Sequence, residues 1–390
     1  MPKTILSILF LFSIIKSQEN YSYQKPPKEI LELVDVRLPP RVLIDENRSF
    51  IVYLYRDSYK SISELSDPEM KLAGLRLNPN SNSRSRTNYY NNIMISKIDQ
   101  IGKYAKQIKG LPKNPKLANI KWSPDQTKIA MTNTKEEGVE LWYIDLEKLT
   151  AKKLTGPKLN ASLGDVITWY QDSKNILTKF KLKNSPDIID GKDVVPTGPI
   201  ISSNDGKKAQ NRTYQDLIKN PTDAKNFTQL SNSEIYLVDL NGNKQPFLDA
   251  KMYRNISLSP NGKYVMVSFI KKPFSYLVPY YRFPTQTSVY DLNSREIKVI
   301  SDAPLQEVLP KGFMAVSTNK RNISWRKDHP ASLYYVQALD QGNPEVDVPF
   351  RDAIYQWEAP FSGTQILLTK VKNRYAGIIW GNETNAIVYD

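Results

Sequence analysis

The residues that could carry out chemistry in this chain are few. The sequence contains one histidine, His329, and no cysteine. A Ser-His-Asp site needs its histidine beside a serine on a sharp strand-to-helix turn. His329 lies instead in an Asp-His-Pro stretch between two apolar runs, which is typical of a turn. The lack of cysteine excludes disulfides, thiolate metal ligands and cysteine nucleophiles. We therefore expect His329 to be structural.

Other catalytic signatures are also missing. None of the 16 glycines belongs to a Gly-x-Ser-x-Gly motif, and Gly377–Gly381 has that spacing without the serine. The carboxylate pairs Asp187/Asp190 and Glu136/Glu137 lie in polar stretches, where we expect them to be solvated. The sequence shows no phosphate-binding glycine loop and no histidine–carboxylate cluster with metal-ligand spacing. We expect no catalytic, cofactor or metal site within these 390 residues.

The charge balance could suggest a nucleic-acid partner. The formal net charge is +14, but the lysines are scattered through strand-like and turn-like stretches without a dense basic block. A generally basic, solvated surface explains this distribution better. We therefore predict no nucleic-acid partner.

The first 20 residues have the pattern of an export signal. Lys3 precedes an apolar or small run, Ile5–Ile15, which is long enough for a signal-peptide core and too short to cross a bilayer. We predict a signal peptide over residues 1–17, with cleavage near Ser17–Gln18 and export to the periplasm or the exterior. No later segment is apolar enough to predict a membrane span.

Two further features could mark an exposed surface. The tyrosine-rich stretch Phe274–Pro284 is either an exposed aromatic patch or a buried blade edge. Eight Asn-x-Ser/Thr sequons occur, including Asn47, Asn160, Asn255 and Asn322. Several are expected by chance in a chain this rich in Asn, Ser and Thr.

A repeated hairpin supplies the scaffold. "IKWSPDQTKIA" begins at Ile120, and similar stretches begin at Ile167, Ile256 and Ile323. Each has an apolar entry, an Asp or Asn five residues after the Ile, and a strand-like run. A weaker copy covers Val42–Tyr55. We expect Trp122 to pack between neighbouring units and Asp125 to make the turn.

A second repeated piece follows the hairpins. It reads as a strand ending in Asp-Leu, a polar turn and another strand, at Leu141–Thr155, Ile235–Leu248 and Ser288–Ser301. Together the two pieces predict a four-stranded antiparallel unit, and the first two hairpins are about 40–50 residues apart, one propeller blade. We predict an all-β propeller with about five to six blades present. A β-sandwich would not repeat the two pieces in alternation.

Two insertions interrupt the blades, at about residues 60–92 and 181–233. We expect Asn78–Asn92 to form a polar surface loop and Tyr214–Ile218 to lie in a short helix. Such excursions lie on one face of a propeller, where binding residues collect. The last residues end on Val-Tyr-Asp, like Val289–Asp291, so we expect the domain over residues 18–390 to be truncated within a blade.

Several stretches are specific enough to indicate a family. They are "ISELSDPEMKLAGLRLNP" (62–79), "PTGPIISSNDGKKAQNRTYQDLIKNPTDAKNF" (196–227) and "RNISWRKDHPASLYYVQALDQGNPEVDVPFRDAIYQWEAPF" (321–361). They resemble the glutamyl endopeptidase branch of the prolyl-oligopeptidase clan and its bacterial relatives. The resemblance extends from Lys25 to Asp390.

This resemblance implies that the propeller and the catalytic residues lie in separate domains. In that family a seven- or eight-bladed propeller precedes an α/β-hydrolase domain that carries the Ser, Asp and His. The chain would then be the non-catalytic, substrate-gating propeller of a serine peptidase, with peptide substrates cleaved in a hydrolase domain absent from this sequence. The alternative is a free-standing exported propeller that binds a protein or a glycan. The sequence leaves the cleavage preference and the oligomeric state open.

Overall fold

The computed structural model describes residues 24–100, 105–190 and 213–390. The expected signal peptide, residues 1–17, lies outside them. Within the described ranges, no helix combines the length and the apolar character that a membrane crossing needs.

The described strands form five four-stranded antiparallel blades. Blade 1 contains β1 (Arg41–Ile44), β2 (Phe50–Tyr55), β6 (Asn92–Lys97) and β7 (Lys106–Gln107). Blade 2 contains β8 (Leu117–Trp122), β9 (Lys128–Lys135), β10 (Gly138–Asp145) and β11 (Thr150–Lys153). Blade 3 contains β12 (Ile167–Trp169), β13 (Asn175–Phe180), β14 (Ser233–Asp239) and the first part of β15 (Lys244–Leu258). Blade 4 contains the rest of β15 with β16 (Tyr264–Ile270), β17 (Thr285–Asp291) and β18 (Glu296–Ala303). Blade 5 contains β19 (Arg321–Trp325), β20 (Ser332–Ala338), β21 (Asp352–Glu358) and β22 (Ile366–Val371).

Smaller elements complete the described chain. A two-stranded sheet, β23 (Gly377–Trp380) with β24 (Ala386–Tyr389), follows blade 5. The helices are α1 (Lys28–Val34), α2 (Ile62–Leu65) and α3 (Pro221–Ser231), with short 3₁₀ turns at Ile98–Gln100 and Tyr280–Arg282. The prediction of a propeller with five to six blades is confirmed, and the sandwich alternative is wrong.

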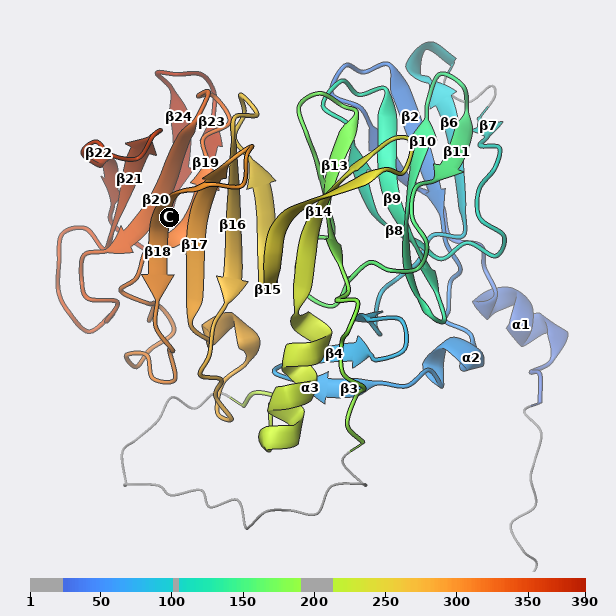
Figure 1. The fold of residues 1–390 in the computed structure, drawn as a ribbon, viewed down its shortest axis with the longest axis horizontal. Helices are drawn as coiled ribbons and strands as arrows, with labels where there is room; N and C mark the ends of the chain where they lie inside the picture. Colours follow the sequence, from blue (N-terminus) through green and yellow to red (C-terminus); the bar gives the residue numbers. More distant parts are fainter. Residues whose placement is uncertain (1–23, 101–104, 191–212) are drawn as a thin grey trace, which may run out of the picture.

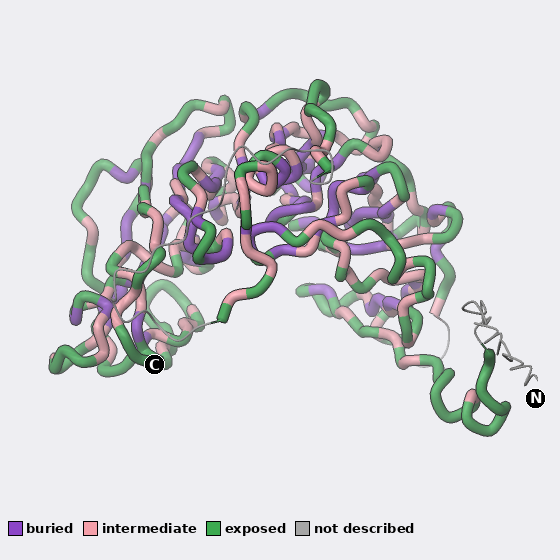
Figure 2. Tube along the Cα trace, turned by 90° about the horizontal axis from the view of Figure 1, so that it is seen from below, coloured by how far each residue is buried: buried purple, intermediate pink, exposed green. Residues whose placement is uncertain are grey.

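The blades stand side by side around an open arc, which is clearest from below (Figures 1 and 2). An apolar cluster lies between each pair of neighbouring blades. The clusters include Ile93 with Met131, Val139 with Ile167, Leu177 with Val267, and Val289 with Leu333. Each fully buried aliphatic side chain contributes roughly 1.5–3 kcal/mol, so blade-to-blade packing is the main source of stability.

The repeated hairpin is the first hairpin of each blade. Its tryptophan ends the innermost strand, and two of these tryptophans bind the preceding blade. Trp169 Nε1 donates to the carbonyl of Lys121 at 3.0 Å, and Trp325 Nε1 donates to that of Ser257 at 3.4 Å. Trp122 packs against the cluster shared by blades 1 and 2. The predicted packing of Trp122 between blades is therefore confirmed.

Asp125 makes the turn of its hairpin, as predicted. It accepts hydrogen bonds from Ser123 Oγ at 2.5 Å, from the Thr127 N–H at 3.0 Å and from Lys128 Nζ at 3.1 Å. Partial burial opposes ionisation of this carboxyl, but these donors hold the pKa of Asp125 well below its usual range. The Asp125 N–H donates to Ser173 Oγ in the next blade at 3.0 Å, so the turn also ties two blades together.

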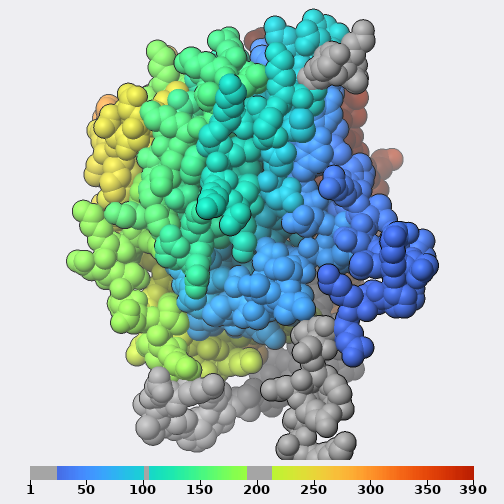
Figure 3. Space-filling view, turned by 90° about the vertical axis from the view of Figure 1, so that its right-hand side faces the viewer, coloured from blue at the N-terminus to red at the C-terminus, as the bar shows by residue number. Residues whose placement is uncertain are grey.

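The two insertions meet on one face of the arc and form what we call the cap, residues 56–91 and 213–232 (Figure 1). The first insertion contributes α2 and a small sheet, β3 (Met70–Leu72), β4 (Leu75–Asn78) and β5 (Ser83–Arg84). The second contributes α3. In the space-filling view the blue first insertion lies below the strands of blade 2 (Figure 3). Leu72 and Leu77 share one apolar cluster with Phe227 and Leu230 of α3.

Two local predictions in the insertions are wrong. Tyr214–Ile218 is not helical, and the helix begins later, at Pro221, because Asn220 caps it by accepting from the Asp223 N–H at 2.8 Å. The predicted surface loop contains Asn82, which is 7% exposed. Its Nδ2 donates to Ser162 Oγ and to the carbonyl of Leu230, both at 3.0 Å. The side chain of Asn82 thus forms buried hydrogen bonds within the cap.

A buried ion cluster fastens blade 5 to the segment that follows it. Asp340 and Asp352 are each 0% exposed. Arg374 lies between them, with Nη2 2.6 Å from Asp340 Oδ2 and Nη1 3.0 Å from Asp352 Oδ1. Arg351 also binds Asp340, at 2.8 Å, and Arg321 also binds Asp352, at 2.6 Å. Each buried carboxylate thus has two guanidinium partners.

A candidate binding cleft on the cap face

Three adjoining cavities lie where the cap meets the blades, with volumes of about 1050, 360 and 400 Å³. Tyr89 lines all three cavities. Lys60 and Lys116 line both the first and the second, and Arg84 lines the second and the third. We call the continuous space the cap cleft. The volumes of the second and third cavities lie within the range of small-ligand pockets.

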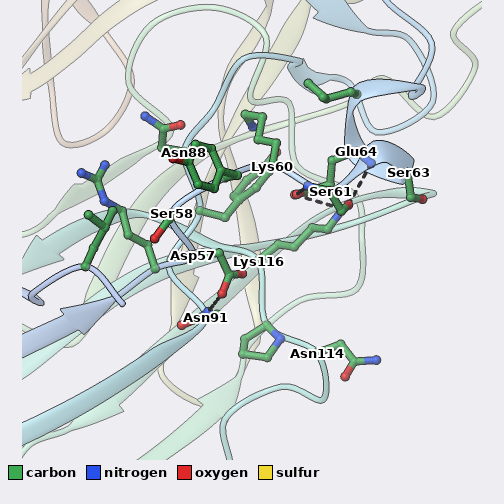
Figure 4. A pocket seen from close by; sticks show the side chains of 16 residues that line it. Asp57, Ser58, Lys60, Ser61, Ser63, Glu64, Asn88, Asn91, Asn114 and Lys116 are labelled. Atoms are coloured by element: carbon green, nitrogen blue, oxygen red, sulfur yellow. Dashed lines mark hydrogen bonds and ion pairs between the residues drawn. The ribbon is translucent and has the colours of Figure 1, made fainter. Parts of the chain in front are cut away.

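The first cavity is shaped by α2 (Figure 4). This helix begins with a capping box, in which the Glu64 N–H donates to Ser61 Oγ at 3.1 Å and the Ser61 N–H donates to Glu64 Oε2 at 3.2 Å. The box fixes Glu64 at the cavity wall, where Lys116 Nζ lies 3.7 Å from its Oε1. The local sequence Ser-Ile-Ser-Glu therefore determines where this carboxylate stands.

Two ammonium groups lie over the ring of Tyr89. Lys60 Nζ is 5.5 Å from the ring centroid and Lys116 Nζ is 6.0 Å from it. Lys60 Nζ also donates to the Thr87 carbonyl at 2.5 Å. Cation–π attraction orients both lysines toward the ring. The middle of the cleft is consequently an aromatic surface flanked by positive charge.

The third cavity lies at the beginning of the innermost strands of blades 2 to 4. Its wall includes Asn119 of β8, Asp165, Arg254 and Asn255 of β15, and Arg84 of the cap. Among the described residues, the Arg84 side chain has no hydrogen-bond or ion-pair partner and is exposed. This end of the cleft therefore presents a guanidinium that is available to a ligand.

Arg254 is held more firmly. Its guanidinium lies 5.5 Å from the ring centroid of Tyr280, and Nη1 donates to Thr285 Oγ1 at 3.4 Å. Burial lowers the pKa of Arg254 from its ordinary value, and the neighbouring Tyr280 opposes that change. Tyr280 and Thr285 thus hold the Arg254 guanidinium in place at the wall of the third cavity.

A buried lysine lies beneath the third cavity. Lys179 is 1% exposed, and its Nζ donates to the carbonyls of Leu163 and, at 3.4 Å, Tyr253. Burial lowers the pKa of Lys179 to about 7, the charge of Asp165 opposes that change, and the charge of Arg84 adds to it.

Replacing Lys179 by methionine is expected to remove a pH-dependent part of the stability. An unfolded lysine has a pKa of about 10.4, above the folded value of about 7, so the unfolded chain binds more protons between these limits. The native stability contributed by this group is present above the unfolded pKa and is lost as the pH falls toward 7. The free energy of unfolding is measured with urea at pH 7 and at pH 9.5. Between these two pH values it should rise by about 2–3 kcal/mol more in the native chain than in Lys179→Met.

Lys153→Met, at a lysine whose side chain is 52% exposed, is the matched control and should show no comparable gain. A difference between native chain and Lys179→Met that stays constant from pH 7 to pH 9.5 would contradict the assignment.

The candidate residues of the sequence fall outside the third cavity. His329 lies in the turn between β19 and β20, with Nε2 4.0 Å from Asp328 Oδ2. Gly377–Gly381 is largely strand β23. Asp187, Asp190, Glu136 and Glu137 are all exposed, as expected, and Glu136 lines the second cavity.

The stretch Phe274–Pro284 has one buried face and one exposed face. Val278 and Phe283 are each 2% exposed and belong to the cap cluster, and the rings of Phe274 and Phe283 stack with centroids 5.3 Å apart. The other face of the stretch is open to solvent; its exposed members are Tyr276, Leu277 and Tyr281. It is a loop between β16 and β17 rather than a blade edge.

The sequons also differ in their surroundings. Asn160 is 1% exposed, and its Nδ2 donates to the carbonyls of Leu230 at 3.0 Å and Asn232 at 2.9 Å. An N-linked glycan on Asn160 is incompatible with this arrangement. Asn47 and Asn322 are exposed, and Asn255 lies in the third cavity.

The sequence did not bring the residues of the third cavity together, although Asn255 was noted as a sequon and one further signal was present. Asn119, Asn255 and Asn322 each precede the isoleucine that opens a hairpin copy. The innermost strands are irregular at these places, and Asn119 and Asn322 have φ of 53° and 55°. Asparagine tolerates this left-handed conformation better than most residues. The repeated asparagine thus marks a register irregularity in the innermost strands of blades 2, 4 and 5.

Comparisons with known proteins point to one group. The chain is 34% identical over 389 residues to "Probable glutamyl endopeptidase, chloroplastic" of Oryza sativa subsp. japonica, covering 96% of this chain and 41% of that protein. It is 31% identical over 381 residues to the protein of the same name from Arabidopsis thaliana, covering 94% of this chain and 39% of that protein. The chain therefore spans about two fifths of the length of these curated relatives. No protein-family model matches the chain.

Solved structures resemble the chain more distantly. A structure from a study of two prolyl endopeptidases has a TM-score of 0.42 and 12% sequence identity, covering 88% of this chain and 36% of that one. A likeness of this size has no bearing on function.

Proposed function

The chain is a homologue of glutamyl endopeptidases and resembles the propeller portion of peptidases of the prolyl-oligopeptidase clan, and on this premise we propose that it is the non-catalytic, substrate-gating propeller of an exported serine peptidase. The observation that carries the proposal is the 34% identity over 389 residues to a protein named as a glutamyl endopeptidase. Catalysis would reside in an α/β-hydrolase domain outside these residues, and the substrates would be peptides.

The cap cleft is the part of the chain that suits a gate. It joins a first cavity of about 1050 Å³ at the side of the cap to a third cavity at the innermost strands. An extended peptide has one residue per roughly 3.3–3.6 Å and no bulky side structure, so it fits a narrow path that excludes folded proteins. A gate of this kind also keeps bulk water and large proteins from a reaction centre.

The chemistry assigned to the whole enzyme is acyl transfer. A serine hydroxyl attacks the peptide carbonyl, a histidine accepts its proton and passes it to the leaving amine, and an aspartate orients the histidine. The role of the propeller is selection before this step. The name of the relatives suggests cleavage after glutamate, which the basic wall of the cleft would tolerate. Export through residues 1–17 belongs to the same proposal.

Blocking the cleft tests the gate. The 390 residues contain no cysteine, so Asn88→Cys, at an exposed position of the first cavity, places one new thiol there (Figure 4). In the protein expressed from the complete reading frame, coupling a maleimide–polyethylene glycol to this thiol should lower the kcat/KM for a short glutamate-containing peptide at least about tenfold.

Arg295→Cys is the matched control, because Arg295 is 77% exposed and follows the turn between β17 and β18. Coupling there should leave kcat/KM unchanged. Equal activity of the two coupled proteins would show that peptides do not pass the cap cleft, and a reading frame that stops at residue 390 would favour the free-standing binding propeller.

A further inference from the structure

We propose that the third cavity is a carboxylate-binding site, in which Arg84 and Arg254 receive an acidic group of a peptide. That the peptide is a substrate rests on the proposed function, but the binding itself does not. The site is assembled from the cap, from β8 and β15, and from the residues that precede β12.

The charged side chains around the third cavity favour binding of an anion. Arg84 and Arg254 line it, and the buried Lys179 donates to the carbonyls of Leu163 and Tyr253, the residues that precede Gly164 and Arg254 of the wall. The acidic side chain in the wall is Asp165, and Lys121 Nζ already lies 3.8 Å from its Oδ1. The two arginines of the wall are thus accompanied by one carboxylate, which is shared with Lys121. A ligand carboxylate would supply the negative charge that the two arginines lack in this wall.

The two arginines differ in a way that suits recognition. Arg254 is held by Tyr280 and Thr285, so its position is fixed before a ligand arrives. Arg84 is exposed and, within the described part of the chain, has no side-chain partner, so it can turn toward a ligand without breaking a bond. Guanidinium groups bind carboxylates through paired N–H donors. The fixed Arg254 and the adjustable Arg84 would then both donate hydrogen bonds to the same carboxylate.

The remaining wall favours a peptide over a small inorganic anion. Asn119, Asn255 and Thr134 offer amide and hydroxyl groups that can pair with peptide N–H and C=O groups. The volume of about 400 Å³ exceeds what an isolated anion needs and continues into the second cavity through Arg84 and Tyr89. The carboxylate could belong to a glutamate or aspartate side chain or to the end of a peptide.

Binding of labelled peptides to the chain tests this site. The probes are a hexapeptide blocked at both ends with one central glutamate, its glutamine counterpart, and the glutamine peptide with a free carboxyl terminus. Fluorescence anisotropy at low salt should show the blocked glutamate peptide binding at least about tenfold more tightly than its blocked glutamine counterpart, which corresponds to one lost charge-assisted contact. Tight binding of the free-carboxyl peptide alone would also support a carboxylate site and would assign it to chain ends.

Arg84→Gln should reduce the preference for the carboxylate to less than about threefold without loss of folding, because Arg84 is exposed and unpartnered among the described residues. Arg254→Gln should do the same, and its thermal melt shows whether the fold is kept. Arg295→Gln removes the same charge far from the site in sequence and should keep the native preference. Equal affinity for all three peptides, or equal behaviour of Arg84→Gln and Arg295→Gln, would overturn the proposal, while peptidase activity of the complete protein would be untouched by that outcome.

Discussion

Replacing Arg374 by methionine is expected to lower the free energy of unfolding by about 3–5 kcal/mol, because it removes a partner from two buried carboxylates at once. Arg374 is 8% exposed, whereas Asp340 and Asp352 are each 0% exposed. Its Nε also donates to the Met314 carbonyl at 2.8 Å, so the loss would loosen the segment after blade 5 as well. Methionine keeps much of the side-chain volume and isolates the effect of charge.

Urea unfolding at pH 7 measures this loss. Arg295→Met is the matched control, because Arg295 is 77% exposed and pairs with Asp291 at the surface, where such pairs contribute at most about 1 kcal/mol. Burial opposes ionisation of Asp340, but its bonds to Arg374 and Arg351 hold the pKa of Asp340 below its ordinary value. This stability is present above the unfolded pKa of about 3.9 and is lost as the pH falls. Equal losses in the two variants at pH 7 would refute the role of the cluster.

Replacing Gly164 by alanine is expected to destabilise the chain by about 3 kcal/mol or more, since the new methyl group cannot be placed. Gly164 has φ of +61°, and a Cβ there would lie 1.6 Å from the carbonyl oxygen of Arg254. The obstacle is backbone of β15, which cannot rotate away as a side chain could. The same close approach holds Arg254 at the wall of the third cavity.

Gly156→Ala is the control, because a Cβ at Gly156 would meet no atom within 4 Å. It should change the unfolding free energy by less than about 1 kcal/mol. Thermal or urea unfolding of the two variants distinguishes the outcomes, and a Gly164→Ala chain as stable as the native one would show that β15 does not pack this closely.

The blades were predictable because their signal is local. The turn at Asp125 needs residues within a few positions of one another, and the Asp-Leu pieces recur at the same place in blades 2, 3 and 4. Trp122 could likewise be assigned to the blade interface, because every copy of the hairpin presents an apolar residue at that position. Such patterns recur along the chain, so each copy supports the next.

The cap and the buried ion cluster were not predictable because their partners are distant in sequence. From the sequence, Asn82 is expected to be an exposed loop residue. In the fold it donates to the carbonyl of Leu230, which is 148 positions away. Arg374 and Asp340 look like solvated charges until the fold buries both. The third cavity has the same origin, since Arg84 belongs to the cap and Arg254 to β15, and the fold places both in one cavity wall. Hydrogen bonds and ion pairs between residues far apart in the chain produce no repeating pattern in the sequence.

Catalysis by a serine outside residues 1–390 is tested most directly by fluorophosphonate labelling, followed by mass-spectrometric mapping of the modified residue. The 390-residue chain and the protein expressed from the complete reading frame are treated in parallel. We expect stoichiometric labelling of a serine beyond residue 390 in the complete protein and no labelling of the chain alone. Stoichiometric labelling of a serine within residues 1–390 would contradict the assignment of this chain as a non-catalytic propeller.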